Sequence, residues 1–319
     1  MTHRHHTGSH AVPPLCRRVL LVALTVLLCA PAHAEDGDAT GVRYDRLALV
    51  GGSAATFRYL GFRYVDRAWY QGQKLDSIRW LNDWDGATYV NFDKAGHFMG
   101  GLFLAQTLND AYTWVGFGPR SAALLGTVTS WAALLEIEMR DAYFDQWGFS
   151  IPDFVANTAG ASLPLIHALF PRTTAIRFKF SYFPSALYRD RERRALAGQP
   201  HIDHAIDDYE GMTAWMTIAI DEWLSGRAGE LWPDYLGLGL GYGVVGLHGS
   251  NVKSRGRFKH HKDRLDARPE FFLGLDYDAR HLSGRHPLWR YFAEQLNWIR
   301  FPAPAIRVYP DLRFYLIYM

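Results

Sequence analysis

Thiols are nearly absent from this chain. Its 319 residues include two cysteines, Cys16 and Cys29, and both lie in the first 34 residues. That segment has the order of a signal peptide: a basic pair at Arg17–Arg18, an apolar run at residues 19–28, and small residues that end at Ala34. We therefore expect cleavage after Ala34, which leaves a mature chain without a disulfide, a thiolate metal site or a cysteine nucleophile.

An uncleaved anchor and a lipoprotein are the two alternatives for this segment. The apolar run is shorter than the roughly 20 residues that a helix needs to span a membrane. A lipoprotein signal has a small residue directly before the lipidated cysteine, whereas Leu28 precedes Cys29. We therefore expect an exported protein that carries no lipid on Cys29, lies in the periplasm and is associated with a membrane face.

A large net charge of either sign is also lacking. The chain has 34 basic and 32 acidic residues, and loss of the signal removes three arginines but no acid, which leaves 31 against 32. Because a nearly neutral chain does not attract a polyanion, nucleic acid is not an expected partner. Common catalytic signatures are missing as well: the sequence contains no Walker-type phosphate loop, no G-x-S-x-G and no H-E-x-x-H.

The first half of the chain is rich in apolar helical sequence. Residues 121–135 and 154–171 contain no Asp, Glu, Lys or Arg, which is typical of helices buried in a core or against a membrane. Since these stretches fall just short of a comfortable membrane span, we expect a compact bundle that lies against a membrane rather than crosses it. The expected helices are Arg43–Trp69, Asp93–Asn109, Arg120–Met139 and Pro152–Phe170.

Capping residues and small residues predict how these helices begin and pack. Asn91 and Ser150 each lie two residues before the first residue of an expected helix and are residue types that cap a helix N-terminus. Glycines such as Gly96, Gly100 and Gly160 would let two helix backbones approach closely. The helices are therefore expected to pack tightly.

In the second half of the chain, large and small residues alternate along the sequence. In Tyr235–Val244, glycine occupies every second position and large residues occupy the positions between them, which is the period of a β-strand. A glycine face lets a bulky group pack against the backbone. Similar strands occur in outer-membrane barrels, but the five or six expected here are fewer than the usual minimum of about eight, so a small curved sheet packed on the bundle is preferred. The expected strands are Ile176–Tyr182, Met212–Ile220, Tyr235–Val244, Glu270–Tyr277 and Phe314–Tyr318, with short helices at Asp221–Leu224 and Pro287–Trp298.

Together these patterns predict an α+β fold in two parts. After the signal at residues 1–34, residues 35–172 are expected to form an N-terminal four-helix bundle that carries a polar motif. Residues 173–319 are expected to form an aromatic, strand-rich antiparallel sheet. The charged run at residues 189–194 predicts either an exposed linker or a solvated helical turn.

The polar motif consists of a few side chains on otherwise apolar helices. Asp93 and His97 are four residues apart, as are Asp153 and Asn157, so each pair shares a helix face. Glu136 lies near the end of the third helix. Because leaving buried polar groups unpaired costs several kcal/mol, we expect these side chains to meet.

Two hypotheses account for such a meeting. The first is a structural network of Lys94, Glu136, Asp141, Asp153 and Asn157. The second is a functional site that holds a divalent metal, the one candidate cofactor, or supplies an acid–base pair for a lipid-linked substrate. The metal ligands would then be Asp93, His97, Glu136 and Asp153, and the catalytic candidates would be these four with Asn157, supported by Lys94, Asp141 and Ser150.

Three segments of the chain resemble a known pattern: N-F-D-K-A-G-H-F-M-G-G, L-L-E-I-E-M-R-D and G-F-S-I-P-D-F-V-A-N-T-A-G-A. They resemble the VanZ-like motif, which has D-K-x-x-H-F, a Glu near the end of the next helix, and S-x-x-D-x-x-A-N-x-x-G. The chain is more similar to the YfiM-like predicted periplasmic proteins, a family of unknown function in which aromatic strands follow such a motif. The resemblance runs roughly from Tyr44 to Tyr318 and implies motif positions at Asp93, Lys94, His97, Glu136, Ser150, Asp153, Asn157 and Gly160.

A cationic run lies between two of the expected strands. Lys253, Arg255, Arg257 and Lys259 are the first four of its six basic side chains. Such side chains can hold the phosphates of lipid headgroups, although a solvated loop is the alternative.

Three functions stay open at this point. The leading hypothesis is a non-enzymatic cell-envelope protein that binds or organises membrane lipids or other envelope components. The first alternative is a metal-assisted or acid–base hydrolase or transferase that acts on a lipid or lipid-linked cell-wall substrate. The second alternative is a small membrane pore or transporter component. The sequence leaves the oligomeric state open.

Overall fold

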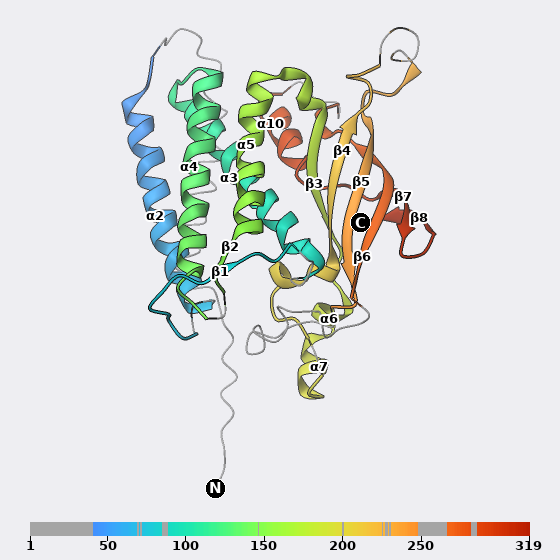
Figure 1. Cartoon of the computed structure of the whole chain (residues 1–319). Helices are drawn as coiled ribbons and strands as arrows, with labels where there is room; N and C mark the ends of the chain where they lie inside the picture. Colours follow the sequence, from blue (N-terminus) through green and yellow to red (C-terminus); the bar gives the residue numbers. More distant parts are fainter. Residues whose placement is uncertain are drawn as a thin grey trace.

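Figure 1 shows a layer of long helices beside a curled sheet, in a computed structural model of the chain. The structure describes residues 41–68, 70, 72–84, 89–145, 147–199, 201–224, 226, 229, 231–247, 267–281 and 286–319. The expected signal peptide and the cationic run at residues 253–259 lie outside the described residues. The order of helices followed by antiparallel strands confirms the α+β class.

The elements follow one another along the chain as two groups. The helices are α2 (Tyr44–Ala68), α3 (Phe92–Val115), α4 (Pro119–Asp141), α5 (Ile151–Leu169), α6 (Ala186–Arg189), α7 (Arg191–Leu196) and α10 (Pro287–Leu296). The strands are β1 (Trp80–Leu81), β2 (Phe149–Ser150), β3 (Ile176–Tyr182), β4 (Met212–Ala219), β5 (Leu236–Val245), β6 (Arg268–Tyr277), β7 (Ala303–Tyr309) and β8 (Arg313–Tyr318). The charged run at residues 189–194 is helical, in α6 and α7, and residues 221–223 form a turn rather than the expected short helix.

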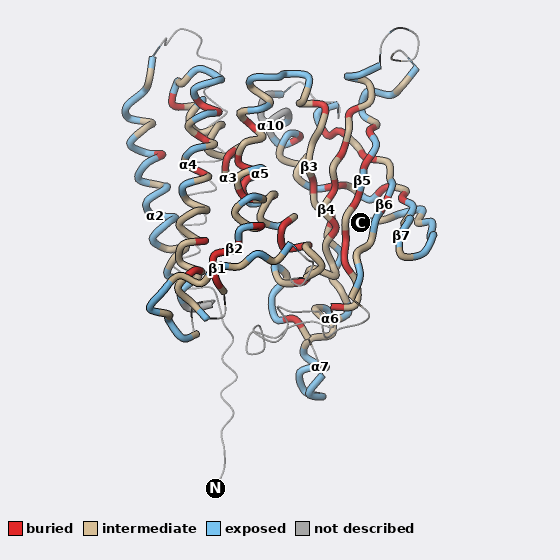
Figure 2. The backbone as a smooth tube through the Cα atoms, in the orientation of Figure 1, coloured by how far each residue is buried: buried red, intermediate tan, exposed pale blue. Residues whose placement is uncertain are grey.

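The helical half has a core of three helices. Helices α3, α4 and α5 pack against one another, whereas α2 lies at the side and is mainly exposed (Figure 2). Val50 is the one described apolar side chain of α2 that is buried. The structure therefore does not confirm a four-helix bundle.

Glycines set the close approach of α3 and α5. A Cβ atom at Gly160 would lie 1.9 Å from the carbonyl oxygen of Phe98, and one at Gly101 would lie 2.5 Å from that of Asn157. Both positions are therefore restricted to glycine by backbone contact. Gly96 and Gly100, which were expected at such a contact, have nothing within 4 Å of an added Cβ, because they lie on the exposed side of α3.

The two expected helix caps have different outcomes. Ser150 caps α5, since its hydroxyl accepts a hydrogen bond from the backbone N–H of Asp153 at 3.2 Å. Asn91 precedes α3 but makes no side-chain cap, because its backbone is left-handed at φ 64°. Tyr89 and Val90 also have positive φ. Three consecutive left-handed residues other than glycine are a strained entry to α3.

The sheet is a six-stranded antiparallel meander in the order β3-β4-β5-β6-β7-β8. Strand β7 was not expected from the sequence. The sheet curls because the chain before β7 returns to β3, where the backbone N–H of Phe180 bonds to Trp298 and that of Arg300 bonds to Phe180. The glycines of β5 face the inside of the curl, where an added Cβ at Gly241 would lie 2.8 Å from the Trp215 ring.

The two faces of this sheet have an unusual polarity. The inner face holds Trp215 together with buried charges, among them Lys179, Asp276 and Arg300. The outer face is apolar. Helices cover it at the β3–β4 end, where the ring of Phe98 on α3 packs edge-on against Phe178 on β3, and the outer face of β5 to β8 continues beyond them.

Candidate functional site

A buried lysine at the start of α3 is surrounded by three carboxylates. The Nζ atom of Lys94 lies 2.7 Å from Asp83, 2.9 Å from Asp93 and 3.0 Å from Asp153. The lysine side chain is only 8% exposed. The ammonium donates hydrogen bonds to Asp83 and Asp93 and forms an ion pair with Asp153, so the group is a charge-assisted network rather than an open cleft.

The local fold brings these carboxylates together from three segments. Strands β1 and β2 pair in parallel, with Leu81 opposite Ser150, which places the chain after β1 beside the start of α5. The Ser150 hydroxyl then donates to Asp83 at 2.8 Å while it accepts from the N–H of Asp153. One serine therefore fixes both the helix cap and an aspartate partner of Lys94.

His97 lies one turn further along α3 and forms a second branch of the cluster. Its Nδ1 atom lies 3.2 Å from the Asn157 amide oxygen and 3.5 Å from Glu138. Its Nε2 atom lies 3.6 Å from Asp153. Asn157 in turn donates to Glu138 at 3.0 Å. His97 is 30% exposed whereas Glu138 is 1% exposed, so the branch runs from the surface into the interior.

The surplus of acid over base perturbs the titration of the buried groups. Burial, reinforced by the charge of Asp153, raises the pKa of Asp93 to about 7 despite the nearby lysine. Burial and the charge of Asp153 also raise the pKa of Glu138 to about 8. Burial opposes the charge on Lys94, but the carboxylates of Asp93 and Asp153 outweigh it and raise the pKa of the ammonium.

The structure brings most of the predicted site residues together, but not all of them. Asp93, Lys94, His97, Ser150, Asp153 and Asn157 belong to the cluster. Glu136 does not join it, because it faces α2 and pairs with Arg58 at 2.5 Å beside an open cleft of about 400 Å³. Asp141 accepts a hydrogen bond from Tyr70 at 2.7 Å instead.

Glu138 and Asp83 are the cluster members that sequence reasoning missed. The buried face of α4 runs through Ala122, Gly126 and Ser130, and further steps of four residues lead to Glu138 rather than to Glu136. That helical period was the available signal. Asp83 lies in a connecting segment, and no pattern in the sequence links it to Lys94.

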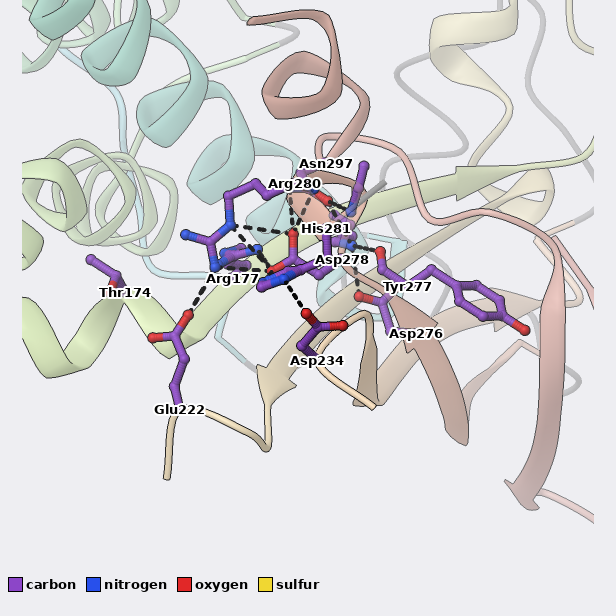
Figure 3. Close-up of polar contacts among 12 residues, drawn as sticks. Thr174, Arg177, Glu222, Asp234, Asp276, Tyr277, Asp278, Arg280, His281 and Asn297 are labelled. Atoms are coloured by element: carbon purple, nitrogen blue, oxygen red, sulfur yellow. Dashed lines mark hydrogen bonds and ion pairs between the residues drawn. The ribbon is translucent and has the colours of Figure 1, made fainter. Parts of the chain in front are cut away.

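A second polar cluster lies at the edge of the curled sheet and is shown in Figure 3. Asp278 accepts from Arg177 at 2.5 Å, from Arg280 at 2.9 Å and from Asn297 at 3.0 Å. Arg280 also pairs with Glu222 at 2.8 Å. In the same region Lys179 pairs with Asp276 at 2.6 Å. The alternation of Arg177, Lys179 and Ser181 along β3 was the signal for this cluster, which the sequence analysis did not use.

The two clusters differ in what they can bind. In the sheet cluster, Arg177, Lys179 and Arg280 pair with the carboxylates of Glu222, Asp276 and Asp278, and His281 pairs with Asp234. These pairs tie the chain after β6 to β3. In the helical cluster Lys94 occupies the point shared by three carboxylates, which favours the structural network there. The described residues that can hold a metal are His97, Glu138 and Asp153, whose donor atoms all lie within 4.8 Å of one another.

Residues 80–168 match the model of a family described as predicted periplasmic lipoproteins (DUF2279). The matched segment runs from β1 to α5 and contains every residue of the helical cluster, although it is less than half of the chain. It supports a periplasmic protein of an uncharacterised family, while the YfiM-like and VanZ-like resemblance stays a prediction. No curated protein and no solved structure matches the chain.

Helix α4 is the one described helix with the length and apolar composition to cross a membrane. Only 28% of its apolar window is buried. Because the core helix of a soluble protein passes the same test, this single helix gives weak support for a spanning arrangement.

Proposed function

We propose that this protein is a periplasmic envelope protein that docks on a lipid bilayer through the outer face of its curled sheet. The observation that carries the proposal is the uncovered part of that face, on strands β5 to β8. Leu240, Leu273, Leu316 and five further large apolar side chains there are each between 40% and 70% exposed. The five others are Leu238, Phe271, Ile306, Val308 and Phe314.

These side chains form continuous rows because the strands are in register. Leu240 lies opposite Leu273, which lies opposite Ile306, which lies opposite Phe314. Cross-strand neighbours of this kind are within contact distance. Monomeric soluble proteins rarely expose an apolar surface that extends over four strands.

The charges of these four strands support a lipid-facing surface. All of them occupy the alternate, inward positions or the strand ends, where Glu270 pairs with Arg307 and Asp276 pairs with Lys179. A sheet with apolar residues outside and polar residues inside has the polarity of sheets that face lipid. The charged residues concerned are Arg268, Glu270, Asp276, Arg307 and Arg313.

Two further observations agree with a membrane surface. The family description of residues 80–168 names periplasmic lipoproteins, which are held at a membrane. The cationic run of Lys253, Arg255, Arg257 and Lys259 lies in sequence between β5 and β6, two of the four strands of the apolar face. Basic side chains of this kind are suited to anionic headgroups.

The test is flotation with large unilamellar vesicles of phosphatidylethanolamine and phosphatidylglycerol. Every protein in the series carries Cys29→Ser, so that an acyl chain cannot contribute. The protein with the unchanged outer face should float with the vesicles. The triple variant Leu240→Ser, Leu273→Ser, Leu316→Ser should partition about 100-fold more weakly, since each half-exposed leucine contributes about 1 kcal/mol of transfer.

The matched control removes three exposed aliphatic residues elsewhere. Leu196, Ile206 and Leu231 are 92%, 61% and 74% exposed and lie away from strands β5 to β8. Their replacement by serine should leave flotation unchanged. If both triple variants lose flotation equally, the outer face does not bind lipid. The same conclusion follows if the wild type does not float and instead self-associates in sedimentation velocity.

A further inference from the structure

We propose that His97, Glu138 and Asp153 bind a divalent first-row transition-metal cation through one imidazole nitrogen and two carboxylate oxygens. The three side chains come from three different helices, α3, α4 and α5, and their donor atoms lie within 4.8 Å of one another. The inference is independent of the lipid-facing sheet, because it rests on the helical cluster alone.

The hydrogen bonds of Asn157 fix the orientation of the histidine. Its amide nitrogen donates to Glu138, so its amide oxygen faces His97 Nδ1 and accepts from it. In a neutral imidazole the proton is then on Nδ1, and Nε2 carries the lone pair. A hydrogen bond from the second ring nitrogen is how proteins orient a metal-binding histidine.

The lone pair of His97 Nε2 therefore faces another acceptor. Asp153 presents a carboxylate oxygen to it at 3.6 Å, and the other oxygen of that carboxylate faces Lys94. Two acceptors that face each other repel unless a positive centre lies between them. That position accepts a cation, held from the side by His97 and Asp153.

The charges of the cluster favour a divalent cation over a single proton. Glu138 is 1% exposed and bonds to the neutral amide of Asn157, while Asp153 shares the ammonium of Lys94 with Asp83 and Asp93. A proton offsets one negative charge, whereas a divalent ion offsets two. Burial strengthens this preference, because uncompensated charge is costly away from water.

The donor set and its dimensions indicate the class of ion. Mixed imidazole and carboxylate ligands suit Zn²⁺, Mn²⁺ or Fe²⁺ rather than the all-oxygen preference of Ca²⁺. Ligand atoms about 2.1 Å from one ion are at most about 4.2 Å apart, so the longest separation must close by about 0.6 Å. His97, at 30% exposed, is the most exposed of the three ligands.

The test measures metal binding to the full-length chain after removal of bound ions with a chelator. The first ten residues contain four histidines that bind metal nonspecifically, so the comparison is between variants that all retain them. In equilibrium dialysis with Zn²⁺ or Mn²⁺, the wild type should bind one equivalent more than His97→Ala. His167→Ala, which removes another partly buried histidine on α5, should bind as the wild type does.

Two further measurements separate ligation from folding. Pulsed electron paramagnetic resonance of bound Mn²⁺ should show coupling to one imidazole nitrogen, and this coupling should disappear in His97→Gln. Asn157→Ala should weaken binding about 10- to 100-fold, the usual effect of losing the group that orients a ligand. Equal stoichiometry and affinity in the wild type, His97→Ala and His97→Gln would overturn the proposal, as would an unchanged nitrogen coupling.

Discussion

The helical half and the sheet half of this molecule balance buried charge in different ways. In the helical half acids outnumber bases in the buried cluster, and Asp93, Asp110 and Glu138 all have a raised pKa. In the sheet half the buried carboxylates of Asp276 and Asp278 pair with Lys179 and Arg177, and burial lowers the pKa of Lys179 and of Arg300. An interior with excess carboxylates attracts protons or metal ions. An interior whose cations pair with carboxylates or carbonyl oxygens of the same chain needs no bound ion for charge balance.

Arg300 shows how the sheet half satisfies a buried cation without a ligand. Its guanidinium donates to the carbonyl oxygens of Tyr318 and Leu275, both at 2.9 Å, and lies 4.0 Å above the Trp215 ring. Such carbonyl and cation–π contacts stabilise arginine in an apolar interior. The sheet cluster therefore has a structural role, and the helical cluster is where we propose the metal site.

The largest expected effect follows from removing the lysine of the helical cluster. Lys94→Met leaves the carboxylates of Asp83, Asp93 and Asp153 without their cation. Breaking a buried ion pair from one side costs about 3–5 kcal/mol, and the free energy of unfolding measured with urea should fall by that amount. Lys74→Met, at an exposed lysine, is the control and should change it little. A mild effect of Lys94→Met would mean that the cluster is less buried than the structure shows.

A smaller loss of stability is expected from removing one charge of the sheet cluster. Asp278→Asn leaves Arg177 and Arg280 without their shared carboxylate, and it should lower the free energy of unfolding by about 2 kcal/mol. Asp234→Asn is the control, because it removes a carboxylate that is 65% exposed and pairs with His281. If both variants unfold alike, the sheet cluster does not stabilise the fold.

The smallest expected effect is a pH dependence in the helical half. Burial raises the pKa of Asp110 to about 6, although a hydrogen bond from Gln106 acts against it. A carboxyl group whose pKa is higher in the folded chain stabilises most when protonated, so its contribution is present below about pH 4 and is lost as pH rises through about 6. When the pH is raised from 4 to 7, the free energy of unfolding should therefore fall by about 1–3 kcal/mol less in Asp110→Asn than in the wild type.

Urea denaturation at several pH values in that range checks this prediction. Asp203→Asn, at a carboxylate 40% exposed and paired with His201, should retain the slope of the wild type. An Asp110→Asn slope that equals the wild-type slope would contradict the account of Asp110 as a buried acid.

The sequence predicted the helices well because their signals are local. Long uncharged stretches, the proline at the start of α4 and the serine cap of α5 depend on neighbouring residues alone. The pairing of Asp153 and Asn157 with residues of α3 was also predictable, since polar side chains on apolar helices must find partners. The choice of Glu138 over Glu136 required the phase of α4, for which the small residues Ala122, Gly126 and Ser130 at steps of four were the signal.

The sheet was less predictable because its curl depends on distant contacts. Strand β7 contains one proline and two alanines, so its sequence lacks the alternation that identified β5. The return of residues 298–300 to β3 closes the curl, and only that closure shows which face of each strand is outside. The alternation of β5 was clear from the sequence, but the sequence alone did not show that its leucines face outward.

The most direct test of the account uses the absence of cysteine from residues 35–319. Without Cys16 and Cys29, a single nitroxide label can be placed through Leu316→Cys on the outer face and, as a control, through Leu196→Cys on α7. On addition of phosphatidylethanolamine–phosphatidylglycerol vesicles, the label at 316 should become more accessible to oxygen and less accessible to a polar nickel complex, while the label at 196 should not change. Unchanged accessibility at both positions would contradict docking of the sheet on lipid.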